Sequence, residues 1–140
     1  MELPKALAWA AKRHNAVLIT IRADGRPQSS DISYTLDGDA FLISVTANRA
    51  KTANMRRDPR VVLHITDAPS WSYLSLDGTV ELSPVTTTAD DDTANRLVAY
   101  YRAVAGKDHP DWAEYRQAMI NEGRLIARVI PSSTVGQIHE

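Results

Sequence analysis

Two Asp-Gly pairs divide the first third of the sequence into runs that alternate polar and apolar residues. One pair, at positions 24–25, separates residues 15–22 from residues 28–36, and the other, at 37–38, precedes residues 40–46. Asp-Gly readily supplies the positive φ angles of tight hairpin turns, and alternation with period two is typical of half-buried strands. The three runs therefore predict consecutive antiparallel strands.

The rest of the chain adds strands and helices to this meander. Strands are predicted at 60–66, at 71–83 with an interruption at Asp77-Gly78, and at 124–130, where Pro131 kinks or ends the strand. Helices are predicted over 4–13, 49–58, 90–105 and 110–122. The segment 132–140 stays unassigned. These elements predict one α+β domain, residues 1–140, mainly antiparallel and most simply a small barrel with peripheral helices.

The charge and the cysteine content narrow the function classes. The net charge of -1 gives no electrostatic basis for binding nucleic acid or a membrane surface. The absence of cysteine excludes disulfides and a cysteine nucleophile, which suits a reducing cytoplasm. No apolar run approaches the ~18 residues of a membrane span, and the first residues lack the apolar core of a signal peptide. We therefore expect a soluble cytoplasmic protein that binds neither nucleic acid nor membranes.

The most basic segment, residues 44–60, runs from the end of a predicted strand into a short helix that Pro59 ends. Asn48 is the predicted N-cap, which puts Arg49 at the first helical position and Lys51 two residues later. Cations there oppose the helix macrodipole, which favours anions by roughly 0.3–1 kcal/mol each. A phosphate bound between the backbone N–H groups and the two side chains would resolve this opposition. The alternative is a solvated basic helix, and the spacing alone leaves both open.

No metal site or catalytic set is predicted. The four histidines lie in different predicted elements, without the spacing of metal ligands: His14, His64, His109 and His139. The acidic triplet at 90–92 is more typical of a helix N-terminus than of a cation site. The chain lacks phosphate-loop, dinucleotide-binding, zinc-protease and nucleophile-elbow motifs, and no Ser/His/Asp set follows from the spacing.

Aromatic residues and a polar strand add to the candidate binding features. Trp71 and Tyr73 either stack on a ring system or fill the core, whereas Trp112 and Tyr115 have the helical spacing of core residues. Trp71 follows a proline-containing loop, where ligand contacts tend to gather. The polar strand at 28–31, together with an anion-binding helix, predicts a phosphate-bearing cofactor whose ring chemistry needs few protein acids or bases.

Four stretches carry a resemblance to a known family: residues 24–28, 49–60, 71–73 and 115–119. The second is the most specific, because Arg-x-Lys-Thr is followed there by Arg-Asp-Pro-Arg. On these motifs the chain resembles the pyridoxamine 5′-phosphate oxidase-like family of split β-barrel flavoproteins. Within that family it looks most like the branch that uses the deazaflavin coenzyme F420 instead of FMN. The resemblance covers residues 3–136 and implies an FMN-binding split-barrel fold.

The resemblance implies a homodimer with two cofactor sites at the subunit interface. It also implies a set of cofactor-binding residues: Gln28, Asp31, Ser44, Val45, Thr46, Arg49, Lys51, Thr52 and Trp71. In this pattern the three residues of the basic helix bind the phosphate, and the two on the polar strand line the deazaflavin. The three at the end of the third strand offer backbone contacts to the ring, and Trp71 lies over the site from the other subunit or a neighbouring loop. A carboxylate at Asp31 is electrostatically unfavourable beside an anionic cofactor.

The implied reaction is hydride transfer from the reduced deazaflavin to an electron-poor small-molecule substrate. No general acid stands out, so solvent or a site hydroxyl such as Tyr73 would supply the proton. FMN is the alternative cofactor. The alternative function, from a different class, is a non-catalytic protein of the same fold that binds flavin, deazaflavin or haem.

Overall fold

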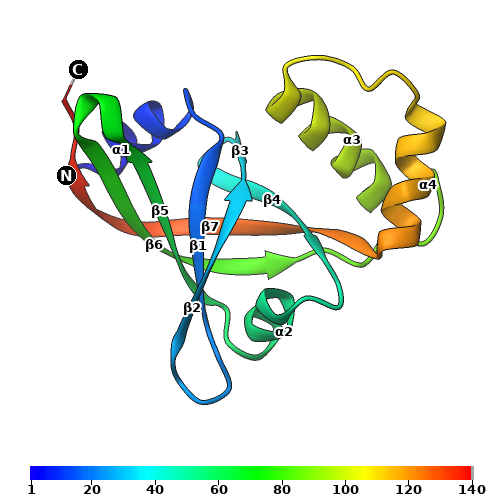
Figure 1. Cartoon of the computed structure of the whole chain (residues 1–140), viewed down its shortest axis with the longest axis horizontal. Coiled ribbons are helices and arrows are strands. Elements are labelled where there is room, and N and C mark those ends of the chain that lie inside the picture. The colour runs from blue at the N-terminus through cyan, green and yellow to red at the C-terminus, as the bar shows by residue number, and fades with distance from the viewer. Residues whose placement is uncertain (140) are drawn as a thin grey trace.

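One curved antiparallel sheet dominates the computed structural model, which describes residues 1–139 (Figure 1). Within this range seven strands are hydrogen-bonded in the order β2-β1-β5-β6-β7-β4-β3. They are β1 (Asn15–Ile21), β2 (Pro27–Ser33), β3 (Thr35–Asp37), β4 (Ala40–Thr46), β5 (Arg60–Asp67), β6 (Ser72–Leu82) and β7 (Arg124–Gln137). Since β2 and β3 stand at opposite ends of this order, the curled sheet stays open along one side. This is the split barrel of an α+β fold, as expected.

Four helices and a short 3-10 turn accompany the sheet within the described residues. They are α1 (Leu3–Ala10), α2 (Ala50–Arg57), η1 (Ala68–Ser70), α3 (Asp92–Ala105) and α4 (Trp112–Glu122). Figure 1 shows α3 and α4 side by side at one end of the sheet, and α2 below it. None of the helices in residues 1–139 is both long and apolar enough to cross a membrane. In the same residues no group of three or more His, Asp or Glu side chains is placed to hold a metal ion.

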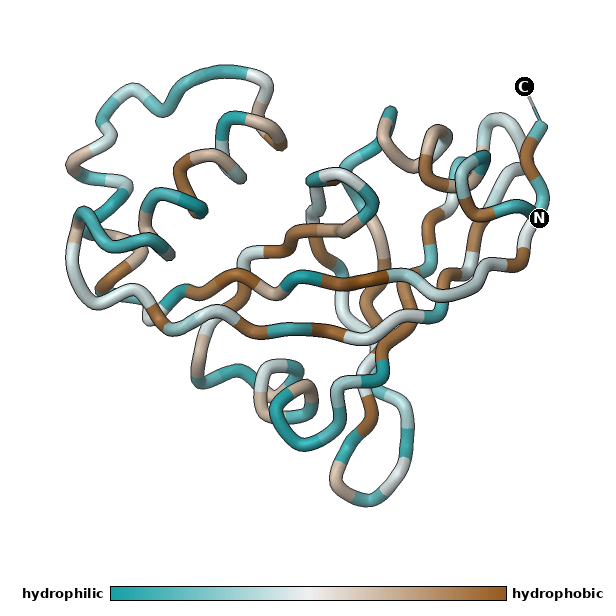
Figure 2. The backbone as a smooth tube through the Cα atoms, turned by 180° about the vertical axis from the view of Figure 1, so that it is seen from behind, coloured by the Kyte–Doolittle hydropathy of each residue, from teal (hydrophilic) through white to brown (hydrophobic). Residues whose placement is uncertain are grey.

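Alternate residues of the strands point into the barrel and form its core. Leu18, Phe41 and Leu63 are completely buried, and Figure 2 shows hydrophobic stretches along the strands. α1 joins the same core, and the buried Tyr34 hydroxyl donates to the Ala10 carbonyl oxygen at 2.7 Å. This hydrogen bond fixes the end of α1 to the corner between β2 and β3.

The α3–α4 hairpin has a smaller hydrophobic cluster of its own. Leu97 and Tyr115 pack there with Ile126 of β7, and the Tyr115 hydroxyl donates to the Leu97 carbonyl oxygen at 2.8 Å. Gly106 and Gly123 end the two helices in the left-handed conformation, as C-cap glycines do. The cluster docks the hairpin beside β7.

Asp91 caps the N-terminus of α3 and ties it to the preceding loop. Its carboxylate accepts hydrogen bonds from the backbone N–H groups of Ala94 at 2.7 Å and Thr87 at 2.8 Å. Backbone hydrogen bonding, led by Thr87, lowers the pKa of Asp91 to about 2, against an opposing rise from burial. Because this pKa is depressed in the folded state, the stabilisation is complete above the ordinary carboxyl pKa of about 3.9 and is lost as the pH falls toward 2.

We expect Asp91→Ala to lower the free energy of unfolding by about 1 kcal/mol at pH 7, the usual contribution of an N-cap. The difference from wild type should shrink between about pH 4 and pH 2 as the wild-type carboxylate is protonated. Urea denaturation across this range measures both effects. Asp91→Asn, which keeps a capping oxygen without the titration, is the control. A gap between wild type and Asp91→Ala that stays constant down to about pH 2 would contradict this role.

Two expected boundaries in the first half of the chain are wrong in detail. The basic helix begins at Ala50, because Arg49 rather than Asn48 is the N-cap, with extended backbone angles (φ -84°, ψ 152°) and no side-chain cap hydrogen bond. The expected strand at 28–36 is broken at Tyr34 into β2 and β3. The Tyr34 side chain is completely buried, so the chain turns there to place it in the core.

The last strand is much longer than expected. β7 continues past Pro131, where the sequence predicts a kink or an end. The interruption expected at Asp77-Gly78 is a register shift opposite this proline, since Asp77 pairs with Ser133 while Gly78 pairs with Pro131. A bulge is a place where a strand tolerates the missing proline N–H. The segment 132–137, left unassigned from the sequence, is therefore strand.

Candidate functional site

Within residues 1–139, the open side of the barrel leaves one edge of β2, and one edge of β4 beyond Leu42, without a partner strand. We refer to the region between these two edges as the split. β3 pairs only with the first three residues of β4. In β7, Ile126 and Arg124 direct their carbonyl groups to the segment after β6. Because opposed residues in antiparallel strands alternate between bonded and unbonded pairs, their β4 partners, Ser44 and Thr46, turn their own backbone groups toward the split.

Val45 differs from these two neighbours. Its side chain is completely buried in the core, and the same alternation directs its backbone groups to Leu125 of β7. Of the three residues predicted to offer backbone contacts to a ring, Ser44 and Thr46 therefore turn their backbone groups toward the split, whereas Val45 turns its own into the sheet.

The first turn of α2 lies at the end of the free edge of β4. The Thr46 carbonyl oxygen accepts hydrogen bonds from the Thr52 hydroxyl at 2.7 Å and from the Arg49 backbone N–H at 3.2 Å. Thr52 is completely buried, so its side chain holds the helix to the strand. The free edge of β4 thus ends next to the residues expected to bind a phosphate: Arg49, Lys51 and Thr52.

Three cationic side chains gather at this point: Arg49, Lys51 and Arg124. Arg124 pairs with Glu122 at 2.9 Å, whereas neither of the others has an ion pair within residues 1–139. Burial lowers the pKa of Lys51, and the charges of Arg49 and Arg124 lower it further. An open polar hollow of about 390 Å³ is lined by Arg49, Arg124 and the Glu122 carboxylate that pairs with Arg124. Arg49 and Lys51 are like charges without a counter-ion in the described residues, which favours a bound anion, so the geometry supports the phosphate interpretation over a solvated helix.

Gln28 reaches α2 through a buried polar network. The Asn54 side-chain amide donates to the Gln28 side-chain oxygen at 2.8 Å and to the Thr20 hydroxyl at 3.0 Å. Asn54 and Thr20 are both buried, so the network fixes α2 against the β1–β2 hairpin. Within one chain, Gln28 therefore helps to position the helix that carries Arg49 and Lys51.

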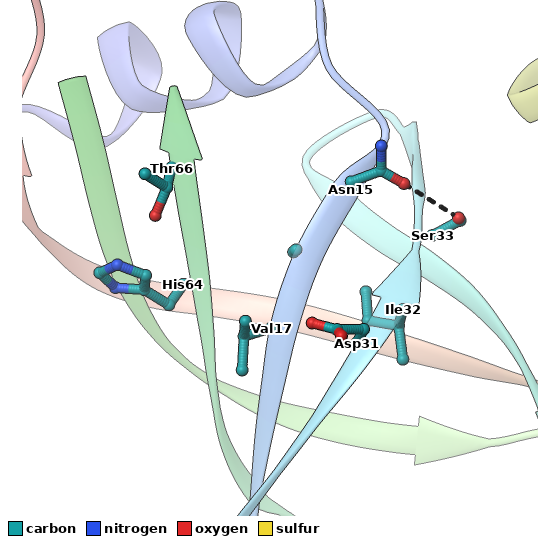
Figure 3. A pocket seen from close by; sticks show the side chains of 8 residues that line it. Asn15, Val17, Asp31, Ile32, Ser33, His64 and Thr66 are labelled. Carbon is teal, nitrogen blue, oxygen red and sulfur yellow. Dashed lines mark hydrogen bonds between the residues drawn. The ribbon is translucent and has the colours of Figure 1, made fainter. Parts of the chain in front are cut away.

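Asp31 lies on the opposite face of β2 from Gln28, as period-two alternation requires for positions an odd number apart. It lines an outward-facing hollow of about 450 Å³ together with Val17 and His64. The strand register places these three residues in one row across β2, β1 and β5 (Figure 3). The two residues expected to line one ring are thus on different faces of the same chain.

Trp71 also lies outside the split. It is 81% exposed and has a left-handed φ of 56°, an unusual conformation for a bulky residue. Beside it Tyr73 stacks on His64, with ring centroids 5.7 Å apart. Tyr73 pairs with the C-terminal end of β7, whereas Ser44 pairs near its N-terminal end. The hydroxyl considered as a proton donor is therefore remote from the split of its own chain.

Two residues near the split, Ser30 and Arg124, are not among the cofactor-binding residues that the resemblance implies, although Ser30 belongs to the predicted polar strand. Ser30 shares the inner face of β2 with Gln28, and its buried hydroxyl has no hydrogen-bond partner in the part of the chain that the structure describes. Period-two alternation puts Ser30 on the same face as Gln28, so the sequence could have predicted its place near the split. Arg124 has no such signal, because only its pairing with Thr46 brings it to the cationic cluster.

A family model described as pyridoxamine 5′-phosphate oxidase matches residues 3–132. The chain belongs to the pyridoxamine 5′-phosphate oxidase family. It is similar to an F420H2-dependent biliverdin reductase from Mycobacterium tuberculosis (strain CDC 1551 / Oshkosh), with 36% identity over 75 residues, 52% of this chain and 53% of the relative. This member of the pyridoxamine 5′-phosphate oxidase family thus spans about half the length of the curated relative it matches.

Two solved structures extend the comparison. An F420 reductase matches with a TM-score of 0.66 and 25% identity, over 94% of each chain. A haem-binding protein from Mycobacterium smegmatis matches with a TM-score of 0.67 and 20% identity, over 97% of this chain and 52% of the other. The second likeness shows the fold alone. Since this fold occurs in a reductase and in a binding protein, it does not by itself decide the function.

Proposed function

We propose that this chain is an F420-dependent oxidoreductase that transfers a hydride to an electron-poor small molecule. The observation that carries the proposal is the pair of cations, Arg49 and Lys51, that have no ion pair within residues 1–139 and lie where the free edge of β4 ends. This arrangement suits a cofactor with a phosphate at one end and a ring along the strand edge. The similarity to an F420H2-dependent reductase supports the deazaflavin over FMN.

The residues at the split fit such a cofactor. Arg49 and Lys51 are charge-assisted donors for a phosphate. The Ser44 carbonyl group and the Thr46 N–H group stay open toward the split and suit the N–H and carbonyl groups of a ring. The buried Ser30 hydroxyl, unpaired among the described residues, would gain a polar partner. FMN also carries a phosphate, so it remains the alternative cofactor for the same donors.

The chain's own part in the reaction is to bind and orient. Reduced F420, when bound, supplies a hydride. Arg49 and Lys51 hold the phosphate, and the hydrogen bond from Thr52 to Thr46 keeps α2 at a fixed place on the strand edge. A cofactor held at one end by charge and along its length by a strand edge has few orientations left, which favours a productive approach of the acceptor.

Acceptor-dependent oxidation of reduced F420 tests the proposed activity. The absorbance of the oxidised coenzyme is followed with a panel of electron-poor alkenes, ketones and nitro compounds, with and without the protein. Oxidation that needs both the protein and an acceptor supports an oxidoreductase. Coenzyme binding without such oxidation across the panel would contradict it and favour the non-catalytic binding protein.

We also propose that two copies of the chain associate through the outer face of the sheet. Asp31 and Trp71 lie outside the split of their own chain, and the exposed side chains of Tyr73 and Val135 share this face with them. A second copy would bury these apolar groups and bring both residues near the other subunit. Sedimentation equilibrium is expected to give twice the mass of the chain, and a monomer at micromolar concentration would contradict the dimer.

A further inference from the structure

Tyr100 projects from α3 to the split. Its hydroxyl donates a hydrogen bond to the Ser33 carbonyl oxygen, at the end of β2, at 2.8 Å. β2 is the outermost strand on its side of the sheet, so this carbonyl group lies on an edge that no other strand of the described chain covers. A helix side chain therefore supplies the hydrogen bond that a neighbouring strand would otherwise make.

The same hydroxyl faces the free edge of β4. Burial raises the pKa of Tyr100, while backbone hydrogen bonding from Ser44 and the charge of Arg124 lower it in part. The strand register independently turns the backbone groups of Ser44 toward the split. The Tyr100 hydroxyl thus bonds to the end of β2 and lies beside the backbone of Ser44 on β4.

We propose that Tyr100 is a positioning residue that sets the width of the split at Ser44, because its oxygen accepts a hydrogen bond from the Ser44 N–H group while its hydroxyl donates to Ser33. A tyrosine hydroxyl both donates and accepts, so here it replaces one strand-to-strand hydrogen bond, between Ser44 and Ser33. Thr46, where the first turn of α2 is attached, lies two residues along β4, about 7 Å away. A ring bound on this edge would lie beside both Tyr100 and the first turn of α2.

The role of Tyr100 toward the ring rests on the proposed function, whereas its role between the strands does not. Without the hydroxyl, the Ser33 carbonyl group and the Ser44 N–H group lose their shared partner, and the two edges are free to separate. Arg49 and Lys51 keep their positions, because the hydrogen bond from Thr52 to Thr46 holds α2 independently. Tyr100 should therefore govern ring binding and leave phosphate binding unchanged.

Tyr100→Phe tests the role between the strands, with Tyr115→Phe as the matched control. Each variant removes a hydroxyl that donates to a backbone carbonyl oxygen at 2.8 Å, but Tyr115 bonds to Leu97 inside the α3–α4 hairpin. Hydrogen exchange followed by NMR should show the Ser44 amide exchanging at least about tenfold faster in Tyr100→Phe and unchanged in Tyr115→Phe. In wild type this amide should be protected although no strand pairs with it. An unprotected Ser44 amide in wild type, or equal rates in the two variants, would overturn the proposal.

Titrations with oxidised F420 and with inorganic phosphate test the role toward the ring. Tyr100→Phe should weaken F420 binding by about tenfold and shift the absorption maximum of the bound ring relative to Tyr115→Phe, with the phosphate affinity unchanged. The same F420 affinity and absorption in both variants would overturn this role. If wild type binds no F420, the proposed cofactor is wrong. The Ser44 exchange rates then still test whether Tyr100 connects the two strand edges.

Discussion

Replacing Arg49 and Lys51 together with alanine is expected to weaken the binding of a phosphate-bearing cofactor by about 10²- to 10⁴-fold. Hydrogen bonds to charged groups contribute about 1.5–3 kcal/mol each, and every 1.4 kcal/mol changes the affinity about tenfold. Neither cation has an ion pair in the described chain, so the full interaction is open to a bound phosphate. Fluorescence titrations with F420 and with FMN measure the loss.

The same double variant is expected to fold at least as stably as wild type in the absence of ligand. Both cations lie at the start of α2, where positive charge opposes the helix dipole by roughly 0.3–1 kcal/mol each. Burial and the charge of Arg49 already lower the pKa of Lys51, which shows that its charged form is disfavoured there. A gain in stability with a loss of binding would identify residues that serve the ligand rather than the fold.

A charge-matched control separates a phosphate site from a general charge effect. Arg56→Ala combined with Lys107→Ala removes the same charge from exposed positions outside the first turn of α2. Exposed charges at a distance are screened by salt, so this control should keep cofactor binding within about twofold. Equal losses in the two double variants would contradict the phosphate site at Arg49 and Lys51.

Gly136→Ala is expected to lower the free energy of unfolding by about 3 kcal/mol or more. Gly136 has a φ of +153°, and a Cβ atom there would overlap the Tyr73 carbonyl oxygen and lie 3.0 Å from the Leu74 Cα. Because these are backbone atoms of β6, the clash is relieved only by moving β6 away from β7. Urea denaturation measures the loss.

Gly38→Ala is the control for backbone strain alone. Gly38 also has a positive φ, +60°, but a Cβ atom there meets nothing within 4 Å. The left-handed conformation by itself costs about 1–2 kcal/mol for a residue with a Cβ atom. If Gly38→Ala and Gly136→Ala lose the same stability, the close approach of β6 and β7 at Gly136 has no energetic consequence and the prediction is wrong.

The hairpins were predictable because two local signals coincide in them. Gly25 and Gly38 have the positive φ angles, 85° and 60°, that the Asp-Gly pairs predict, and the flanking alternation fixes which residues enter the core. The start of α2 was not predictable in this way. Asn48 is intrinsically the better N-cap, but hydrogen bonds to the Thr46 carbonyl group place the helix one residue later. A contact to a neighbouring strand outweighs a local preference there.

The candidate site was predictable only as far as local patterns reach. The basic cluster follows from the sequence, and so does the placement of Gln28 and Asp31 on opposite faces, since their positions differ by an odd number. The family resemblance assigns both to one ring, and we propose that a second copy of the chain accounts for this. Arg124 and Tyr100 reach the split only because β7 pairs with β4 and α3 lies beside them, and neither arrangement has a local signal.

The most direct test of the proposed function is a titration of the purified protein with oxidised F420 and, separately, with FMN, followed by fluorescence polarisation. The predicted result is binding of F420 with a Kd on the order of micromolar, and much weaker binding of FMN. Tight FMN binding would move the protein to the flavin-binding members of its family. Binding of neither would leave the fold and the family intact and contradict the proposed cofactor.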